Sequence, residues 1–538
     1  MSVGTSYKTT KAVDAAYDVV VIGSGIGGLS VAALLAREGQ RVLVLERHYT
    51  AGGATQTWER KGYEWDVGLH YMGEVHKPKS VLRQIFDDIT DAKLTWAPMP
   101  DVYNRIVIED RAYEYVSGAS RFKERMKTYF PRESAAIDRY VELVFEANRA
   151  AQAFYAQRAL PPSMGDALYD QMCAGFRAFS DRTTLSVLEE LTKDRELIAV
   201  LTGHYGDYGL DPSKSAFAVH AMLIRHYIEG ANFPVGGSGR IAETVAPVIE
   251  AAGGAIVTSA EVSGILLERG RAAGVRMRDG REIRAPRVIS DAGVANTITK
   301  LLPEDVAHAS GLYDGLRRVE PSISIVCLNV GVRASASALG LDPANVWVHP
   351  SNDYAANYAR YEADPERAPI PFHFITFASA KDPTWDARFP GRATIDVCSA
   401  TTFAEWRPFA EQPWKKRGAA YEEKKARVAE ALMRQVLRFA PQIEGKVEHA
   451  ELATPLTFKH FAARDQGDFI GLAHTPERFR QRWLRPHTPI EGLFLTGQDI
   501  TSDGVSGAMM GGVLAASAVL GRNVLDDIKS RRAAAASA

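Results

Sequence analysis

The chain has 538 residues, and 64 Lys plus Arg stand against 65 Asp plus Glu, so its formal net charge is −1. This even balance argues against nucleic-acid binding, which needs a concentrated positive field. Hydrophobic residues make up 46% of the chain and charged residues 24%, a globular composition that excludes intrinsic disorder as the main state. At about 150 residues per domain, the length favours about two to four domains.

The sequence predicts a protein without a membrane span. No apolar run reaches about 18 residues, and residues 1–16 lack the apolar core of a secretory signal. We expect residues 1–16 to form a loose leader and residues 529–538 a frayed tail. The only cysteines are Cys173, Cys327 and Cys398, far apart in the sequence, so neither a disulfide scaffold nor a metal site is supported. A reducing, cytoplasmic location fits best.

The first motif is a strand, a glycine-rich turn and a helix. Residues 17–22 form an apolar, β-branched run typical of a buried parallel strand. Gly23, Gly25 and Gly28 then satisfy the G-x-G-x-x-G pattern, and residues 29–38 read as a helix that Gly39 caps. This arrangement is typical of a turn that binds a dinucleotide.

The glycines and the next strand have separate tasks. One glycine makes the tight turn, one lets the backbone approach a pyrophosphate, and one lets helix and strand pack closely. The helix N-terminus offers free N–H groups to the phosphates. A second strand, 41–45, ends at Glu46, which can accept both ribose hydroxyls. Gly52 and Gly53 follow, and they suggest backbone that runs close to a flat ring system.

The C-terminal region contains a second strand, turn and helix of the kind that binds part of a dinucleotide. Residues 492–495 predict a short strand, 496–499 a polar turn, and 507–520 a helix of small residues. Asp499 precedes the glycine-rich start of this helix, as in a site for a pyrophosphate or a ribityl chain. Between these two segments, residues 260–290 alternate strands and turns as a β-meander.

With these blocks, the sequence resembles the flavin amine-oxidase superfamily, and within it the phytoene desaturase, carotenoid isomerase and retinol saturase group. Residues 226–241, 288–293 and 504–512 carry the resemblance further along the chain. Residues 66–73 (DVGLHYMG) and 381–385 (KDPTW) look like the retinol saturase branch. Trp65, where Phe is more usual, is a mild departure.

The resemblance implies an FAD enzyme of the α/β class. Its fold would be a Rossmann-type, glutathione-reductase-like FAD-binding domain with an inserted α+β substrate domain and a helical cap. The cofactor-binding positions would be Gly23, Gly25, Gly28, Glu46, Arg47, Gly52, Gly53, Val262, Gly497, Asp499, Val505 and Ser506.

The blocks also suggest a discontinuous domain organisation. After the leader, we expect FAD-binding parts at 17–98, 233–300 and 480–528, which must converge in space. A mostly helical lid is expected at 99–232. A substrate domain is expected at 301–479, with strands at 324–330, 372–377 and 394–397 and a helix at 422–439.

The expected reaction adds or removes hydrogen across a carbon–carbon bond of a long apolar lipid, such as a carotenoid, a retinoid or a fatty acyl chain. Desaturation, saturation and isomerisation remain open. His226, Tyr227, His70 and Tyr71 are the candidates for handling a proton, because they lie inside the resembling blocks. No second nucleotide-binding unit is evident, so we expect a quinone, oxygen or a redox protein as electron partner.

Two alternatives remain, a flavin-free prenyl-lipid escort protein and a flavin amine oxidase. An intact fingerprint argues against the first of these. Because a water-insoluble substrate must come from a bilayer, we also expect peripheral membrane contact, through exposed apolar residues around 154–179. The alternative is that the aromatic residues there only line the substrate tunnel or the core.

Overall fold

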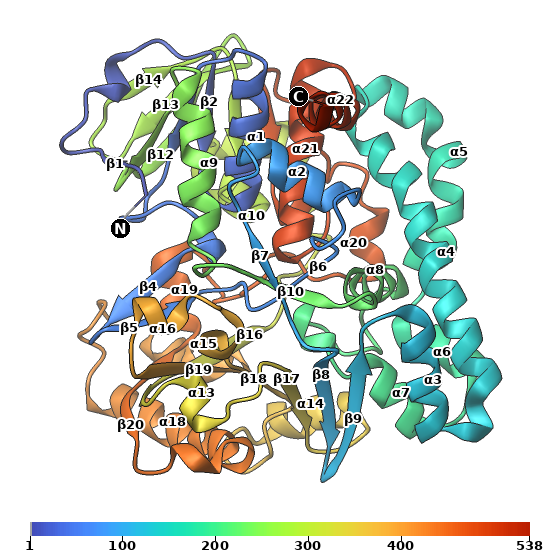
Figure 1. Cartoon of the computed structure of the whole chain (residues 1–538). Coiled ribbons are helices and arrows are strands. Elements are labelled where there is room, and N and C mark those ends of the chain that lie inside the picture. Colours follow the sequence, from blue (N-terminus) through green and yellow to red (C-terminus); the bar gives the residue numbers. More distant parts are fainter. Residues whose placement is uncertain (1–2, 538) are drawn as a thin grey trace.

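The computed structural model describes residues 3–537, and two β-sheets with their helices organise them (Figure 1). The first sheet is parallel and six-stranded, with the order β1-β11-β3-β2-β15-β21. Its strands are β1 (Thr5–Ser6), β2 (Val19–Ile22), β3 (Val42–Leu45), β11 (Ala255–Thr258), β15 (Val288–Ser290) and β21 (Leu493–Leu495). The nucleotide-binding blocks therefore meet in one sheet, although they are far apart in the chain.

Both faces of this sheet are buried, as a parallel sheet requires. Val19 and Val21 pack on the side of α1 (Ile26–Arg37), α9 (Arg240–Ala251) and α21 (Gly504–Leu520). Val20 and Ile22 point to the opposite face. That face is covered by a three-stranded meander of β12 (Val262–Glu268), β13 (Arg271–Met277) and β14 (Glu282–Arg284). The predicted meander is confirmed.

The prediction of a loose leader is wrong within the described residues. Thr5 and Ser6 form β1, which pairs with Val257 and Thr258 at the edge of the parallel sheet. Residues Ala12–Asp14 form a short 3-10 turn, and Val13 is buried. Backbone pairing to a distant strand orders this segment, and no local pattern in residues 3–16 signals it.

The prediction of a frayed tail is also wrong. Helix α22 (Val524–Ser537) packs beside α2 (Val81–Ile89), and Figure 1 shows it above α2. Arg531 forms ion pairs with Glu38 and Asp88 at 2.9 Å, and the Asp88 carboxylate is buried. These long-range pairs fix the helix to the FAD-binding half.

The second large sheet has seven strands in the order β20-β16-β19-β18-β17-β8-β9. Its strands are β8 (Val102–Ile108), β9 (Arg111–Val116), β16 (Ser324–Arg333), β17 (Asn345–His349), β18 (His373–Thr376), β19 (Arg392–Thr401) and β20 (Val447–Ala453). Successive side chains of β16 point to opposite faces of the sheet. Val326 and Leu328 therefore pack in the core beside α18 (Ala419–Phe439), whereas Cys327 and Asn329 line a cavity.

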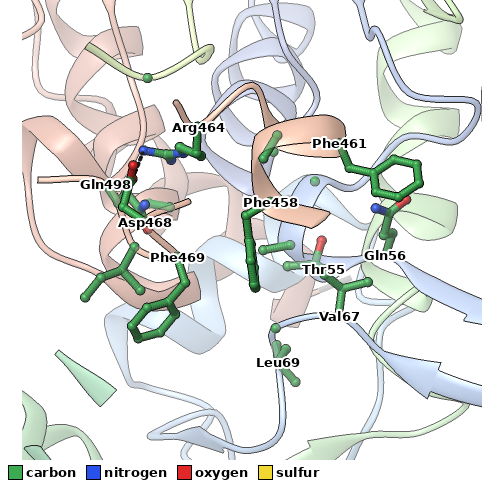
Figure 2. A pocket seen from close by; sticks show the side chains of 18 of the residues that line it. Thr55, Gln56, Val67, Leu69, Phe458, Phe461, Arg464, Asp468, Phe469 and Gln498 are labelled. Atoms are coloured by element: carbon green, nitrogen blue, oxygen red, sulfur yellow. Dashed lines mark hydrogen bonds and ion pairs between the residues drawn. The ribbon is translucent and has the colours of Figure 1, made fainter. Parts of the chain in front are cut away.

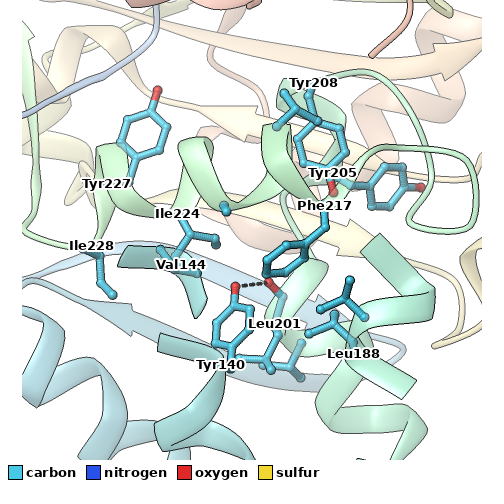
Figure 3. Packing of buried hydrophobic residues seen from close by; sticks show 14 of the residues in the cluster. Tyr140, Val144, Leu188, Leu201, Tyr205, Tyr208, Phe217, Ile224, Tyr227 and Ile228 are labelled. Atoms are coloured by element: carbon cyan, nitrogen blue, oxygen red, sulfur yellow. Dashed lines mark hydrogen bonds between the residues drawn. The ribbon is translucent and has the colours of Figure 1, made fainter. Parts of the chain in front are cut away.

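The segment 99–232 is mostly helical, as predicted, but it begins with two strands that the sequence did not predict. Strands β8 and β9 come first and join the second sheet through β17. The helices follow: α3 (Ala119–Tyr129), α4 (Ser134–Ala159), α5 (Pro162–Ser180), α6 (Thr184–Leu191), α7 (Arg195–Thr202) and α8 (Phe217–Tyr227). Figure 3 shows their shared core, in which Tyr140, Val144, Leu201 and Phe217 pack together.

The aromatic side chains of this segment do not form a docking face. Phe154 is 1% exposed, Phe176 is fully buried, and Phe154 also packs 6.2 Å from Phe479, between ring centroids. The expectation of membrane contact through these rings is therefore wrong, because they hold α4 and α5 against the rest of the protein.

The remaining elements connect the two sheets. A hairpin joins β4 (Thr57–Arg60) to β5 (Tyr63–Asp66), and β10 (Ala231–Pro234) lies between β6 (Met72–Gly73) and β7 (Trp96–Pro98). Helices α19 (Pro455–Ala462) and α20 (Pro476–Arg480) precede β21. No single helix within residues 3–537 is long and apolar enough to cross a bilayer. Only α21 and α22 together reach that length and composition, across a bend of 104°.

Helix α1 begins at Ile26, three residues before the predicted start, and so it includes Gly27 and Gly28. A Cβ at Gly28 would lie 2.4 Å from the carbonyl oxygen of Gly23. Helix and strand can therefore approach this closely only without a side chain.

We expect Gly28→Ala to lower the melting temperature by several degrees and to reduce bound flavin, because the methyl group forces the helix off the sheet. Gly175→Ala is the matched control. Its Cβ would meet only the Ala150 Cβ at 3.8 Å within a regular helix, so it should be neutral or slightly stabilising. Calorimetry and flavin absorbance measure both effects; equal melting temperatures for the two variants would contradict this packing role.

Candidate active site

A cavity of about 1050 Å³ runs between the two sheets. One wall consists of the glycine-rich loops at the carboxyl ends of the parallel strands. The other wall is the second sheet together with α8 and α19. Ligands of open α/β sheets bind at such strand ends.

The fingerprint loop forms a cradle that only glycine backbone allows. Gly23 has φ +98°, and a Cβ at Gly25 would lie 2.5 Å from an Asp291 carboxylate oxygen. A Cβ at Gly53 would lie 2.8 Å from the Gly25 Cα atom. Gly28 and Gly52 do not line the cavity. The first instead packs helix on strand, and the second donates its N–H to the Ser24 carbonyl at 3.1 Å.

Glu46 ends β3 and faces the cavity with a buried carboxylate. One oxygen accepts from the Ser24 N–H at 3.0 Å and from the Ser24 hydroxyl at 2.7 Å, and the other accepts from the His48 N–H at 2.7 Å. These bonds hold the carboxylate beside the glycine loop. Arg47 and Val262 line the same end of the cavity.

The second predicted nucleotide-binding segment, residues 492–520, lies opposite Glu46 in the cavity wall. Gly497 has φ +89°, and Val505 and Ser506 line the cavity in the first turn of α21. Asp499 also lines it, but its carboxylate oxygens accept from the Val294 N–H at 2.9 Å and the Leu472 N–H at 3.0 Å. Asp499 thereby ties two loops together, and its direct contact with a flavin stays a prediction.

These features fit a bound FAD. The N-termini of α1 and α21 both open onto one cavity, so two sets of free N–H groups face it. A buried carboxylate, Glu46, lies where a ribose would bind. Gly23, Gly25, Gly53 and Gly497 line the cavity at positions where a Cβ would come within 3.1 Å of neighbouring protein atoms, so this wall is bare backbone that a ligand can approach closely.

Two further parts of the cavity wall are apolar. Figure 2 shows Phe458, Phe461, Phe469, Val67 and Leu69 around one part of it. Further in, the wall is formed by Val219, Met222, Leu223, Ile325, Trp347, Phe372 and Phe374. Such a wall offers burial but few hydrogen bonds to a ligand, as a long hydrocarbon requires.

The four predicted proton-handling residues all line this cavity, but their environments differ. The Nε2 atom of His226 accepts from the Gly73 N–H at 2.9 Å, and Nδ1 lies 3.8 Å from a Glu74 oxygen. His226 is thus held as a structural bridge. Burial and the Lys381 ammonium lower the pKa of His70 to about 3, so this ring is neutral.

Tyr71 and Tyr227 stack with ring centroids 4.1 Å apart and an interplanar angle of 10°. The Tyr71 hydroxyl donates to a carboxylate oxygen of Asp207 at 2.5 Å, and Asp207 lines the cavity as well. Burial raises the pKa of Asp207 to about 7. Sequence reasoning missed Asp207, because it lies in a short 3-10 turn outside every motif.

A polar network supports Tyr71 from behind. Asn104 Nδ2 lies 3.5 Å from the Tyr71 hydroxyl, and Asn345 donates to Asn104 Oδ1 at 3.0 Å. The Lys381 ammonium donates to Asn345 Oδ1 at 2.5 Å and to the His70 carbonyl at 2.8 Å. Burial lowers the pKa of Lys381 to about 7. Lys381 lies in the segment that resembles the retinol saturase branch.

Two cysteines that are 71 positions apart face each other in the cavity wall. Cys327 and Cys398 are directly paired across β16 and β19, and their Sγ atoms are 2.7 Å apart. Spacing in the sequence gave no sign of this pair. Among residues 3–537, no group of three or more His, Cys, Asp or Glu side chains could hold a metal ion.

Comparison with known proteins agrees with this site. Residues 26–314 match the family model of flavin containing amine oxidoreductases. The chain is 39% identical to the all-trans-retinol 13,14-reductase of Rattus norvegicus, over 95% of this chain and 87% of that protein. It is 26% identical to prolycopene isomerase 2 of an Oncidium hybrid cultivar, over 93% and 83%. A solved oxidoreductase from Methanosarcina mazei has a TM-score of 0.57 at 20% identity, over 94% of this chain and 100% of that one.

The fold, the glycine cradle and these matches define an FAD-dependent oxidoreductase. The chain belongs to the flavin-containing amine oxidoreductase family, on the retinol saturase-like branch that its sequence resembles. FAD is its cofactor, which disfavours the flavin-free escort alternative.

We expect Glu46→Gln to weaken FAD binding by at least tenfold, because the variant loses a charge-assisted acceptor at the cradle. Flavin fluorescence on dilution measures the dissociation. Glu250→Gln, on the exposed face of α9, is the control and should leave the affinity unchanged. Identical FAD affinity in both variants would show that Glu46 only braces Ser24 and His48.

Proposed function

We propose that the enzyme transfers hydrogen to a carbon–carbon double bond of a long polyene lipid of retinoid or carotenoid type. The observation that carries the proposal is the apolar wall of the cavity, which continues directly from the FAD cradle. Relatives named for reduction of retinol and isomerisation of prolycopene support it. Reduction is the favoured direction, because the more similar of these two relatives is named a reductase.

Bound FAD supplies hydride exchange with carbon, and the protein must do the rest. The apolar residues orient the chain and exclude water, so that the hydride does not escape to solvent. Saturation of a double bond also consumes one proton. A residue facing the cavity must deliver that proton to the second carbon atom.

Tyr71 and Asp207 are the best placed residues for this proton. The hydroxyl and the carboxyl share one short hydrogen bond, and both side chains line the cavity among apolar residues. Tyr227 fixes the plane of the Tyr71 ring by stacking, and Lys381, through Asn345 and Asn104, holds it from the far side. We therefore assign proton delivery to the pair and positioning to the other residues. His226 and His70 receive no proton-donating role.

Tyr71→Phe should lower the rate of flavin reoxidation by a polyene by roughly 10² or more, with flavin content unchanged. Tyr103→Phe removes a hydroxyl from the same aromatic cluster outside the cavity and should leave the rate near wild type. Anaerobic stopped-flow absorbance measures both rates. Similar rates in the two variants would remove Tyr71 from the proton path.

The pH dependence follows from the raised pKa of Asp207. Below about pH 7 the carboxyl holds its proton and can pass it on, so reduction should slow as the pH rises above 7. The proton also favours the folded state, and this contribution to stability is lost as pH rises through 7. Asp207→Asn should abolish the break in the rate profile; a break that persists would assign it to another group.

Membrane contact, the electron partner and a cytoplasmic location remain proposals. Tyr49 and Phe461 are 57% and 37% exposed and line the cavity together with Lys415, which is also exposed. Exposed aromatic and basic residues suit peripheral contact with an anionic bilayer. We propose a quinone, oxygen or a redox protein as the electron partner.

Flotation with liposomes tests the membrane contact. Tyr49→Ser together with Phe461→Ser should reduce flotation, whereas Met164→Ser, an exposed residue of α5, should not. Equal flotation of both proteins would place the contact elsewhere.

A further inference from the structure

Arg417 is a buried cation in the wall of the cavity. It precedes α18 and is 7% exposed. Its guanidinium carbon lies 5.1 Å from the ring centroid of Trp414 and 5.2 Å from that of Tyr421. Both aromatic rings also line the cavity. The two rings hold the guanidinium group in place without neutralising its charge.

Arg417 has unusually few acceptors for a buried arginine. No carboxylate among residues 3–537 lies within 4 Å of it. Its polar contacts are the Leu456 carbonyl, 3.4 Å from Nη2, and the Tyr421 hydroxyl, and Nε has no acceptor. Arg478, which is also buried, donates to four backbone carbonyls. Burying a charged group without a partner costs free energy, so the Arg417 guanidinium should bind an acceptor supplied by a ligand.

The surroundings of Arg417 favour an anion. Arg47, Lys415 and Lys425 line the same cavity, and none of them has a carboxylate within 4 Å among the described residues. Two carboxylates, Glu451 and Glu422, also line the cavity, but neither neutralises these cations. Glu451 is already paired with Arg60 at 2.5 Å, and Glu422 is exposed. Four cations without ion pairs therefore line this cavity, and two of them, Arg417 and Lys425, lie over the same ring, that of Tyr421.

We propose that Arg417 anchors an anion-binding subsite, which takes the carboxylate or phosphate of a ligand whose remainder lies in the cavity. The proposal rests on the proposed function for its apolar part, since Phe458 and Phe461 line the cavity on α19, next to the subsite. Two sources supply this chemistry: the acidic head of a long-chain lipid, or a phosphate of a dinucleotide at Arg47. A guanidinium group binds either by paired hydrogen bonds.

The test compares oleate with oleyl alcohol on the FAD-loaded protein by titration calorimetry. We expect the wild-type protein to bind the carboxylate at least tenfold more tightly, and Arg417→Met to reduce this ratio to about one. Arg417→Lys retains the charge and should keep part of the preference, even where the Met variant folds poorly. Arg427→Met, at an exposed position in the helix that follows Arg417, is the matched control.

A second arm measures FAD release from the same variants. If Arg417→Met weakens FAD binding but leaves the oleate preference intact, the anion is a phosphate of the dinucleotide. If neither ligand responds to Arg417→Met, the subsite is overturned. The binding measurements need no turnover, so the two proposals can fail separately. If the protein prefers oleate through Arg417 but reduces no double bond, the proposed function is refuted and the anion-binding subsite stands.

Discussion

The structure depends on backbone-to-backbone contact between two glycine-rich helices. A Cβ at Gly27 would lie 2.6 Å from the Gly497 Cα atom, and a Cβ at Gly511 would lie 2.4 Å from the Gly497 carbonyl oxygen. A Cβ at Gly512 would similarly meet the Gly27 carbonyl at 2.7 Å. This contact brings the N-termini of α1 and α21 to one cavity, although the helices are almost 480 residues apart in the chain. Without it, neither helix could offer its N–H groups to the same cofactor.

The second sheet completes the site by the simple alternation of its strands. Along β16 and β19, one set of side chains packs under α18, and the other set, including Asn329 and Cys398, faces the cavity. Asp207, which lines the cavity, and Lys381, which lies in the network behind Tyr71, are both buried. Burial raises the pKa of Asp207 and lowers that of Lys381, each to about 7. The same burial gives an acid that titrates close to neutral pH and an apolar path for a long ligand.

Local pattern predicted the FAD half well, because strand, glycine turn and helix are encoded within consecutive residues around Gly23. The meander and the family resemblance followed from such segments too. The loose leader and the frayed tail were wrong, because β1 is ordered by Val257 and α22 by Asp88, both distant in sequence. Asp207 and Arg417 could not be found in this way, since their importance lies in what surrounds them. The pairing of Cys327 with Cys398 likewise depends on strand register, which the sequence does not state.

One measurement tests the central claim most directly. The flavin-loaded protein is reduced without oxygen and mixed in D₂O with all-trans-retinol or a carotenoid, and both the flavin spectrum and the lipid mass are followed. The account predicts that the flavin is reoxidised and that the lipid gains two hydrogens, at least one of them deuterium from solvent. Flavin that stays reduced with every polyene, while the oxidised protein converts amines, would contradict it.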